Sequence, residues 1–555
     1  MMLPQVVNQQ KFELPPNTEV VLQKMFVGYQ RIVIKYDFSA LGYSGSWVYR
    51  VHLLKKDATP ELPVVVKIAS VSLIQKEWQA YKGCAQNQWL GIAALRDKPV
   101  LLKDHDLAGL CYEFVGGDVF RLKSLHEYCL DPQVKVEDIR FVLQKRLFEM
   151  MSERIVRPSK NEFYFPLQAS YDRVLPVNLL IRPEPVPEGQ KPTLITPDKL
   201  PAKGLELGER VRLEGFVITK VDLRYPSVTL NLPPHQFPDT YRVRVNSFEG
   251  LKACEFHEEL APLEGVVLET RDSRFKDEIA KLNIEDLDHE SVTLSDGSKL
   301  PNPFAHISSI LAQTRHLKFN CIHGDLNFEN ILVDPDVRDI RLIDFAEAAP
   351  NHILHDFLHL EMEVITKLLP AALSEANLPP DTMYRFYQEL ECATFDFDHC
   401  PAHQLSHKAL EKPFAILTEI RQAAHEGFYD RNDFSEYYQG LTLYLLGALR
   451  FSNLDQSPLA PLPKQVAFFG AAAIQELIKS SAGHEVEPNK PVDDASDTHK
   501  HKPALPTILR SSNPLTKVRA FGQHIGLSIY AVTLLLALFM TMYLVFGLPL
   551  NAGQD

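Results

Sequence analysis

This chain of 555 residues has few cysteines, fewer basic than acidic residues, and no long apolar run at its N-terminus. Its seven cysteines are scattered and no two form a C-x-x-C pair, so their spacing indicates no zinc site and predicts reduced thiols in a cytosolic compartment. The formal net charge of −13 makes nucleic acid an unlikely partner, because binding its phosphate backbone requires excess positive charge. Residues 1–14 carry Gln, Asn and Pro where a secretory signal needs apolar residues, so nothing there predicts secretion.

The length and composition predict several folded units. The chain exceeds the size of one ordinary hydrophobic core, and we expect roughly three to four structural units. Hydrophobic residues make up 45% and charged residues 23%, which is the balance of a folded soluble protein. The sequence shows no internal repeat, so a solenoid or propeller is not predicted.

The C-terminal segment differs in composition from the rest of the chain. Residues 525–548 contain no charged residue, and at about 1.5 Å per residue they can cross a hydrocarbon core of about 30 Å. We therefore predict a transmembrane helix over 525–550, with a buried core helix as the alternative. Residues 481–524 are rich in Pro, His, Asp, Lys and Ser and predict a flexible basic tether. Lys and Arg residues ahead of the span predict, by the positive-inside rule, that the N-terminal body is cytoplasmic.

The strongest chemical signal is a loop and hairpin pattern between residues 321 and 347. Asp325 and Asn330 stand five residues apart on a loop that leads into an apolar, strand-like run, and Asp344 follows a second such run. Pairing of the two runs would bring the three side chains to one cleft. A carboxylate that accepts a hydroxyl proton, with an amide oxygen and a second carboxylate for Mg²⁺, is what phosphoryl transfer from a nucleotide requires. Turn formation by Asp and Asn is the alternative, but it does not explain the spacing.

The same residues carry a family resemblance. Residues 323–326 (His-Gly-Asp-Leu), followed by Asn330, resemble the catalytic loop of the protein-kinase-like superfamily, in the form found in its aminoglycoside and choline phosphotransferase branch. Residues 343–345 (Ile-Asp-Phe) are similar to that superfamily's metal-binding motif. Ala346 stands where a protein kinase has glycine, and no Ala-Pro-Glu segment follows, so a regulated protein kinase is disfavoured.

The resemblance implies a role for each residue of this loop region. Asp325 would be the catalytic base, while Asn330 and Asp344 would hold Mg²⁺. His323 would orient the catalytic loop. Asp356, in a later His-Asp motif, would hold that loop in shape.

The resemblance also implies an upstream lobe that binds ATP, and candidate residues occur in the expected order. Lys67 lies in a buried-strand pattern and would position the α and β phosphates. Glu77, in a helical stretch, is its candidate partner, although a lysine at a strand edge is the alternative. The remaining nucleotide-binding candidates belong to a glycine loop and to a hinge strand: Gly42, Ser44, Gly45, Ser46, Glu113 and Val115.

Three histidines, His352, His355 and His359, have a spacing that brings them to one side of a helix. This pattern can suggest a metal site. We expect instead that they cap or line a helix, because histidine does so without a metal in most proteins.

These signals together predict an α+β protein with a two-lobed kinase-like phosphotransferase fold. Alternating apolar and polar residues between 204 and 271 predict an inserted small β-barrel, for which an OB-like topology is one candidate. Acidic residues outnumber basic ones there, which favours a structural or partner-binding role over oligonucleotide binding. A fainter resemblance links this arrangement to the ternary-complex-associated modules of bacterial conflict systems. The predicted units are the N-lobe at 20–117, the first C-lobe helices at 118–170, the β-rich insertion at 171–300, the C-lobe at 301–480, the tether at 481–524 and the membrane helix at 525–550.

The predicted function is ATP-dependent phosphoryl transfer at a membrane surface. ATP and Mg²⁺ are the expected cofactors, and the expected acceptor is a hydroxyl of a small molecule or a lipid headgroup, with a protein acceptor left open. The alternative is a non-catalytic, nucleotide-binding kinase-like scaffold in a signalling or defence assembly. The sequence names neither the acceptor nor the oligomeric state.

Overall fold

The computed structural model describes residues 3–482 apart from internal gaps at 12, 38–45, 58, 87, 88, 90, 114–121, 156–161, 202, 203, 223–225, 234–239, 251–253, 255–257, 285, 286 and 396–406. The chain divides into two compact units, residues 1–488 and residues 489–555. The predicted membrane helix and nearly all of the predicted tether lie outside the described residues. Within the described part of the chain, no helix combines the length and the apolar character needed to cross a bilayer.

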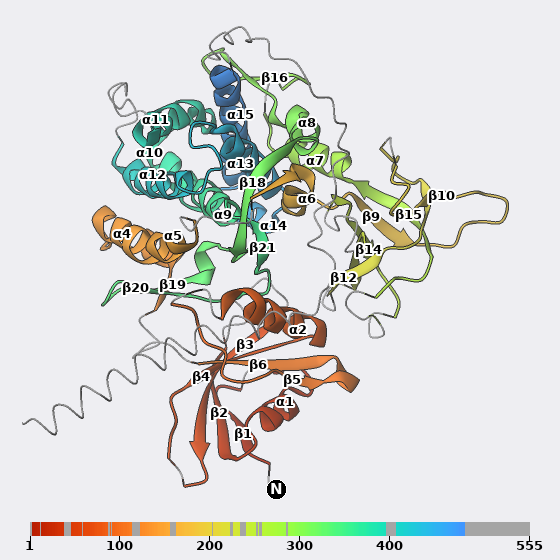
Figure 1. Cartoon of the computed structure of the whole chain (residues 1–555), viewed down its shortest axis with the longest axis vertical. Coiled ribbons are helices and arrows are strands. Elements are labelled where there is room, and N and C mark those ends of the chain that lie inside the picture. Colours follow the sequence, from red (N-terminus) through yellow and green to blue (C-terminus); the bar gives the residue numbers. More distant parts are fainter. Residues whose placement is uncertain are drawn as a thin grey trace, which may run out of the picture. The chain divides into compact units, whose positions relative to one another are not determined.

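The N-terminal lobe is built on a six-stranded sheet with the order β1-β2-β3-β4-β6-β5. Hydrophobic side chains from β2, β3 and β4 form its core together with α1. The elements are β1 (Gln5–Asn8), α1 (Thr18–Met25), β2 (Tyr29–Asp37), β3 (Trp47–Lys55), β4 (Val64–Ala69), α2 (Val71–Ala80), the π-helical turn η2 (Tyr81–Ala85), β5 (Val100–Leu102) and β6 (Leu107–Glu113). Figure 1 shows α2 beside this sheet.

A single residue, Ser70, separates strand β4 from helix α2, and it caps the N-terminus of the helix. The side-chain oxygen of Ser70 accepts a hydrogen bond from the backbone N–H of Leu73, and Asp106 accepts one from Val71. Strand β4 reads Val-Val-Val-Lys-Ile-Ala, a β-branched run suited to a buried strand. The predicted strand around Lys67 and the predicted helix around Glu77 are both present.

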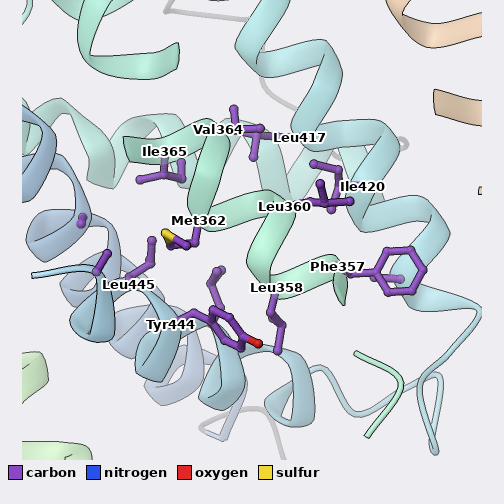
Figure 2. Packing of buried hydrophobic residues seen from close by; sticks show 14 of the residues in the cluster. Phe357, Leu358, Leu360, Met362, Val364, Ile365, Leu417, Ile420, Tyr444 and Leu445 are labelled. Atoms are coloured by element: carbon purple, nitrogen blue, oxygen red, sulfur yellow. The ribbon is translucent and has the colours of Figure 1, made fainter. Parts of the chain in front are cut away.

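The C-terminal lobe is mainly helical. Its larger helices are α9 (His355–Glu363), continued by the π-helical turn η12 (Val364–Leu368) and α10 (Leu369–Ala376), and α11 (Met383–Phe395), α12 (Glu411–His425), α13 (Ser435–Ala448) and α15 (Leu462–Ala482). Helix α9 is buried along its whole length except at His359. In Figure 2, Phe357, Leu358 and Leu360 of α9 pack among side chains of α12 and α13. The lobe also contains α3 (Leu125–Leu130), α4 (Val136–Val142), η5 (Leu143–Phe148), α5 (Glu149–Ile155), α6 (Leu167–Tyr171), η6 (Asp172–Val174), α8 (Ile307–Leu311) and α14 (Ser452–Asp455).

Two small sheets position the catalytic-loop region. The predicted hairpin is present, because β19 (Ile331–Asp334) pairs antiparallel with β20 (Asp339–Leu342) and also with β7 (Lys123–Ser124). The second sheet has the order β21-β18-β8. In that sheet β18 (Thr314–Ile322) leads directly into the loop at residue 323, with β21 (Ala349–His352) on one side and β8 (Glu162–Pro166) on the other.

The insertion forms one curled, seven-stranded sheet with the order β10-β11-β15-β9-β14-β13-β12. The predicted β-rich insertion is present, but in place of the predicted small β-barrel the sheet is a half-barrel whose outer strands β10 and β12 do not pair in the described residues. The elements are β9 (Leu179–Pro183), β10 (Thr193–Ile195), β11 (Arg210–Leu213), β12 (Val217–Asp222), β13 (Ser227–Asn231), β14 (Val243–Asn246), β15 (Leu263–Thr270) and α7 (Arg271–Ala280), followed by the hairpin β16 (Ser291–Thr293) and β17 (Lys299–Pro301).

A buried ion cluster joins the insertion to the C-terminal lobe. Asp172, fully buried in η6, accepts hydrogen bonds from Arg242 beside β14 and from Arg271 at the start of α7. The Arg271 pair is bidentate, with distances of 2.7 and 2.8 Å. Strand β12 on the far side of the sheet contacts α2. The insertion therefore borders both lobes.

The cysteines depart from the sequence-based prediction. Cys84 in η2 and Cys321 in β18 form a disulfide, so the prediction of reduced thiols is wrong for this pair. The two cysteines are 237 residues apart in the sequence but only 5.4 Å apart between their Cα atoms, and spacing along the chain carries no sign of such a contact. Cys111, Cys129 and Cys254 are free, while Cys400 lies outside the described residues.

Candidate active site

A lysine and two carboxylates meet where the lobes face each other. The ammonium nitrogen of Lys67 on β4 lies 2.9 Å from Glu77 Oε2 on α2 and 3.0 Å from Asp344 Oδ1 in the loop after β20. Lys67 and Glu77 are buried, whereas 26% of the Asp344 side chain is exposed. Two adjacent elements of the N-terminal lobe and a loop 277 residues further along the chain therefore converge on one charge cluster, of which Asp344 opens toward solvent.

Burial and mutual attraction set the ionisation of this cluster. Burial opposes the charge of Lys67, but Glu77 and Asp344 outweigh it and raise the pKa of the ammonium group. Burial likewise opposes ionisation of Asp344, and the adjacent Lys67 reverses that effect and lowers its pKa. Glu77 also accepts a hydrogen bond from the hydroxyl of Tyr112 on β6. The lysine is thus held charged by groups from both lobes.

Asp356 of α9 holds the backbone of the predicted catalytic loop. Asp356 accepts hydrogen bonds from the backbone N–H groups of His323 and Gly324, at 2.8 and 2.9 Å. The His323 ring is buried, and its Nε2 lies 2.9 Å from the carbonyl oxygen of Ile343. Gly324 has φ = +79°, and a Cβ there would lie 2.2 Å from the carbonyl oxygen of Glu347. Only glycine fits this turn, which connects the loop to the segment carrying Asp344.

The side chain of Asp325 is partly open to solvent. Of its side chain, 42% is exposed, so another molecule can reach the carboxylate. Even so, desolvation by the surrounding protein raises the pKa of Asp325 to about 6, with His323 opposing and the carboxylates of Asp344 and Glu347 adding to the rise. A carboxyl group with this pKa exchanges protons near neutral pH, which suits a general base.

Asn330 is held against Asp325. Its amide nitrogen donates to the backbone carbonyl of Asp325 at 2.8 Å and lies 3.4 Å from Asp325 Oδ2. Because the amide nitrogen points to Asp325, the amide oxygen is the group that can serve as a ligand. Asp344 adopts φ = +61°, a conformation that costs energy in a residue with a side chain and often marks functional sites. One amide oxygen and a carboxylate of lowered pKa fit a hard cation such as Mg²⁺.

Two of the residues predicted to bind nucleotide through the glycine loop and the hinge strand lie in the described part of the chain, and four lie outside it. Ser46 lies just before β3 and is buried, and Glu113 ends β6 and is exposed. Gly42, Ser44, Gly45 and Val115 lie outside the described residues. The flanking strands β2 and β3 are present and antiparallel, so the glycine-containing segment connects two paired strands of the N-terminal sheet.

Several residues near the site carried no role in the sequence-based prediction. Lys76 of α2 forms an ion pair with Glu347, three residues after Asp344. The guanidinium of Arg173 donates to the carbonyl oxygen of Gly324 at 3.0 Å, next to the anchored Asp172. His359 Nδ1 lies 3.8 Å from Asp325 Oδ1, and burial lowers the pKa of this imidazole. Glu347 and Lys76 were visible as neighbours of motif residues, whereas Arg173 gave no signal in the sequence.

The other two histidines of the predicted group, His352 and His355, form hydrogen bonds with side chains of the same lobe. His352 lies 2.7 Å from both Tyr171 Oη and Glu436 Oε1 through its two ring nitrogens. His355 similarly lies 2.9 Å from Ser170 Oγ and from Tyr444 Oη. Both rings are therefore engaged in hydrogen bonding within the lobe.

Comparison with known proteins places this site in context. A family model described as ternary complex associated domain 9 matches residues 40–450, well over half of the chain. A crystal structure of a thermostable mutant of the aminoglycoside phosphotransferase APH(4)-Ia, in a ternary complex with ADP and hygromycin B, is similar at 11% identity and a TM-score of 0.30, covering 83% of this chain and 98% of that one. A predicted aminoglycoside phosphotransferase from Ralstonia eutropha is similar at 11% identity and a TM-score of 0.31, covering 81% and 93%. No curated protein matches the chain.

Proposed function

The chain belongs to the ternary complex associated domain 9 family, and from the geometry of its interlobe site we propose that it transfers a phosphoryl group from ATP to a hydroxyl acceptor. The observation that carries the proposal is the convergence of Lys67, Glu77 and Asp344, with Asp344 near enough to Asp325 to help raise the pKa of that carboxyl. Asn330 in turn contacts Asp325. A buried lysine that two carboxylates hold charged is suited to binding phosphate oxygens. The open carboxylate beside it is suited to taking a proton from an alcohol.

Each residue of the site has a distinct part in the proposed reaction. Asp325 accepts the proton of the acceptor hydroxyl, and the amide of Asn330 holds this carboxylate in place. Lys67 orients the phosphate chain while Glu77 holds Lys67 in position. Asn330 and Asp344 would hold Mg²⁺, which when bound neutralises charge on the phosphate oxygens. Asp356 keeps the loop rigid, so that little reorganisation accompanies the transfer.

The setting of the reaction is also part of the proposal. We propose that residues 525–550 anchor the chain in a membrane with residues 1–488 on the cytoplasmic side, which places the cleft near small molecules and lipid headgroups at that surface. A chain ending at Pro488 should then move from the membrane fraction to the soluble fraction. If it still sediments with membranes, a surface other than the C-terminal helix holds it there.

The test of the chemistry uses the full-length chain in detergent with Mg·ATP and a panel of alcohol acceptors. We expect ADP formation with at least one acceptor, and we expect Asp325→Ala to lower it by about 10²- to 10⁴-fold, the usual contribution of a general base. ATP affinity should stay within a few-fold of the unchanged protein, because Asp325 faces the acceptor. Glu375→Gln, an exposed carboxylate change on α10, is the matched control and should have no effect.

The scaffold alternative gives a different result. A module that only senses nucleotide would bind Mg·ATP with normal affinity, form no ADP with any acceptor, and respond to Asp325→Ala no more than to Glu375→Gln. That outcome would overturn the phosphotransferase proposal.

A further inference from the structure

The disulfide between Cys84 and Cys321 joins the two parts of the active site that come from different lobes. Cys84 lies in η2, which continues the helix that carries Glu77. Cys321 lies in β18, two residues before His323 of the catalytic loop. The bond therefore ties the carrier of Glu77 to the strand that positions Asp325.

Non-covalent contacts run alongside this bond. On one side of Cys84, the ring of Tyr81 packs edge-on against Phe345, next to Asp344, with centroids 6.0 Å apart. On the other side, the ring of Trp89 lies edge-on to His323 at 6.5 Å. The segment after α2 thus contacts the predicted metal-binding loop, β18 and the predicted catalytic loop in turn. Of these three contacts, the disulfide to β18 is the covalent one, and reduction and oxidation can break and re-form it.

We propose that the Cys84–Cys321 disulfide is a redox latch that holds α2 against the catalytic loop and so keeps the active site assembled. The inference rests on the proposed phosphotransferase function for its effect on activity. In the latched state, which the structure shows, Lys67 and Glu77 are paired at 2.9 Å. Opening the latch leaves α2 held by non-covalent contacts alone, among them the Lys76–Glu347 ion pair, so the assembled arrangement is less populated.

The reaction that opens the latch is thiol–disulfide exchange with a dithiol reductant. Cys321 is partly exposed and Cys84 is buried, so the reductant thiolate attacks the sulfur of Cys321 and the thiolate of Cys84 leaves. The second thiol of the reductant then attacks the mixed disulfide and releases Cys321. The reductant becomes a cyclic disulfide, and two electrons and two protons end on the cysteine pair. Exchange with a small disulfide reverses the reaction.

The expected cytoplasmic location makes a reversible bond the natural interpretation. Disulfides in a reducing compartment are usually transient, and serve catalysis or redox sensing. Two of the other described cysteines, Cys111 and Cys129, do not compete for the bond, because they are buried in the two lobes and burial raises the pKa of each thiol to about 12. Such thiols form little of the reactive thiolate.

The test uses the full-length chain, isolated without reductant and divided into untreated and dithiothreitol-treated samples. Alkylation followed by peptide mass analysis reports whether Cys84 and Cys321 are bonded or free. Amide hydrogen exchange of residues 71–85 reports how firmly α2 and η2 are held, and ADP formation reports activity. We expect dithiothreitol to free both cysteines, to speed exchange over 71–85, and to lower ADP formation about fivefold or more, reversibly on addition of a small disulfide.

Variants separate the latch from general effects of reductant. Cys84→Ser combined with Cys321→Ser should behave like the reduced protein and should not respond to dithiothreitol. Cys254→Ser, which changes a partly exposed cysteine of the insertion, is the matched control and should respond as the unchanged protein does. The reductant experiment on the unchanged protein does not depend on whether the double variant folds.

Two results would overturn the latch. The first is that both cysteines are already alkylated in the untreated protein and a small disulfide does not join them. The second is that the bond opens while exchange over 71–85 stays the same. If ADP formation is absent in both redox states, the proposed function has failed, and the exchange measurement still decides whether the bond restrains α2.

Discussion

Among the buried charge clusters of the described residues, two that are alike in composition can be compared, each with one cation and two carboxylates. In the cleft, Lys67 pairs with Glu77 and Asp344. In the C-terminal lobe, Arg421 of α12 pairs with Glu361 of α9 and Glu391 of α11, at 2.9 and 3.2 Å. Comparing them shows how one set of charges can serve either chemistry or the fold.

The clusters differ in how completely the partners of the cation are fixed. The planar guanidinium of Arg421 bonds Glu361 through two nitrogens, lies 5.0 Å from the ring centroid of Tyr387, and shares Glu361 with the hydroxyl of Tyr437. All these residues belong to helices of one lobe. Lys67 has a compact ammonium group instead, and its partners come from both lobes. An ammonium can exchange a carboxylate for phosphate oxygens without losing its charge. The guanidinium of Arg421 cannot do so without breaking its hydrogen bonds to Glu361 and Glu391.

The largest effect on stability should come from breaking the Arg421 cluster. Arg421→Met leaves two carboxylates without their buried cation and should lower the free energy of unfolding by about 3–5 kcal/mol. Arg338→Met, which removes an exposed arginine paired with Asp138, is the matched control and should cost about 0–1 kcal/mol. Urea denaturation of the chain ending at Pro488 measures both. Equal losses in the two variants would contradict the structural role of Arg421.

The next effect should come from a single hydrogen bond in the same cluster. Tyr437→Phe keeps the aromatic packing but removes the hydroxyl that donates to Glu361 at 2.5 Å. Hydrogen bonds to charged groups are worth about 1.5–3 kcal/mol, so we expect a loss in that range by the same denaturation measurement. Turnover per folded molecule should not change. A drop in turnover without a loss of stability would mean that this cluster also acts on the cleft.

The sequence could assign the predicted site residues to their strands, helices and loops because the patterns that carry them are local. The spacing of Asp325, Asn330 and Asp344 lies within one hairpin and its flanks, and Lys67 and Glu77 lie in adjacent elements. Strand and helix patterns place such residues on elements, and a family resemblance then orders those elements in space.

The features that were missed depend on contacts between distant segments. Arg421 meets Glu361 across 60 residues, and Cys84 meets Cys321 across 237. The half-barrel was predicted as a small β-barrel because closure depends on pairing between its outer strands, which no strand pattern reports. Hydrophobic periodicity predicts where the strands lie in the sequence, but not which strands pair with each other.

In the cleft, removing the cation should cost less stability than in the core. Lys67→Met leaves Asp344, which is partly exposed and can stay hydrated, and Glu77, whose pKa burial already raises so that it can take up a proton beside Tyr112. We expect a loss of about 1–2 kcal/mol, within the usual range for point changes, together with a marked loss of nucleotide affinity. If Lys67→Met lowers the free energy of unfolding as much as Arg421→Met does, the two clusters stabilise the fold to the same extent.

The smallest effect on stability should come from Asp344→Asn, because Lys67 keeps Glu77 as its partner and the amide fills the same space. The change removes the charge that would hold Mg²⁺, while the loop keeps its support from Asp356 through His323 and Gly324. We therefore expect a free energy of unfolding within about 1 kcal/mol of that of the unchanged protein. We also expect nucleotide binding to lose its dependence on Mg²⁺. Calorimetric titration with ADP, with and without Mg²⁺, measures the second effect. If the variant still binds nucleotide more tightly with Mg²⁺, Asp344 is not the metal ligand, and the cleft cluster would then resemble the Arg421 cluster in serving the fold.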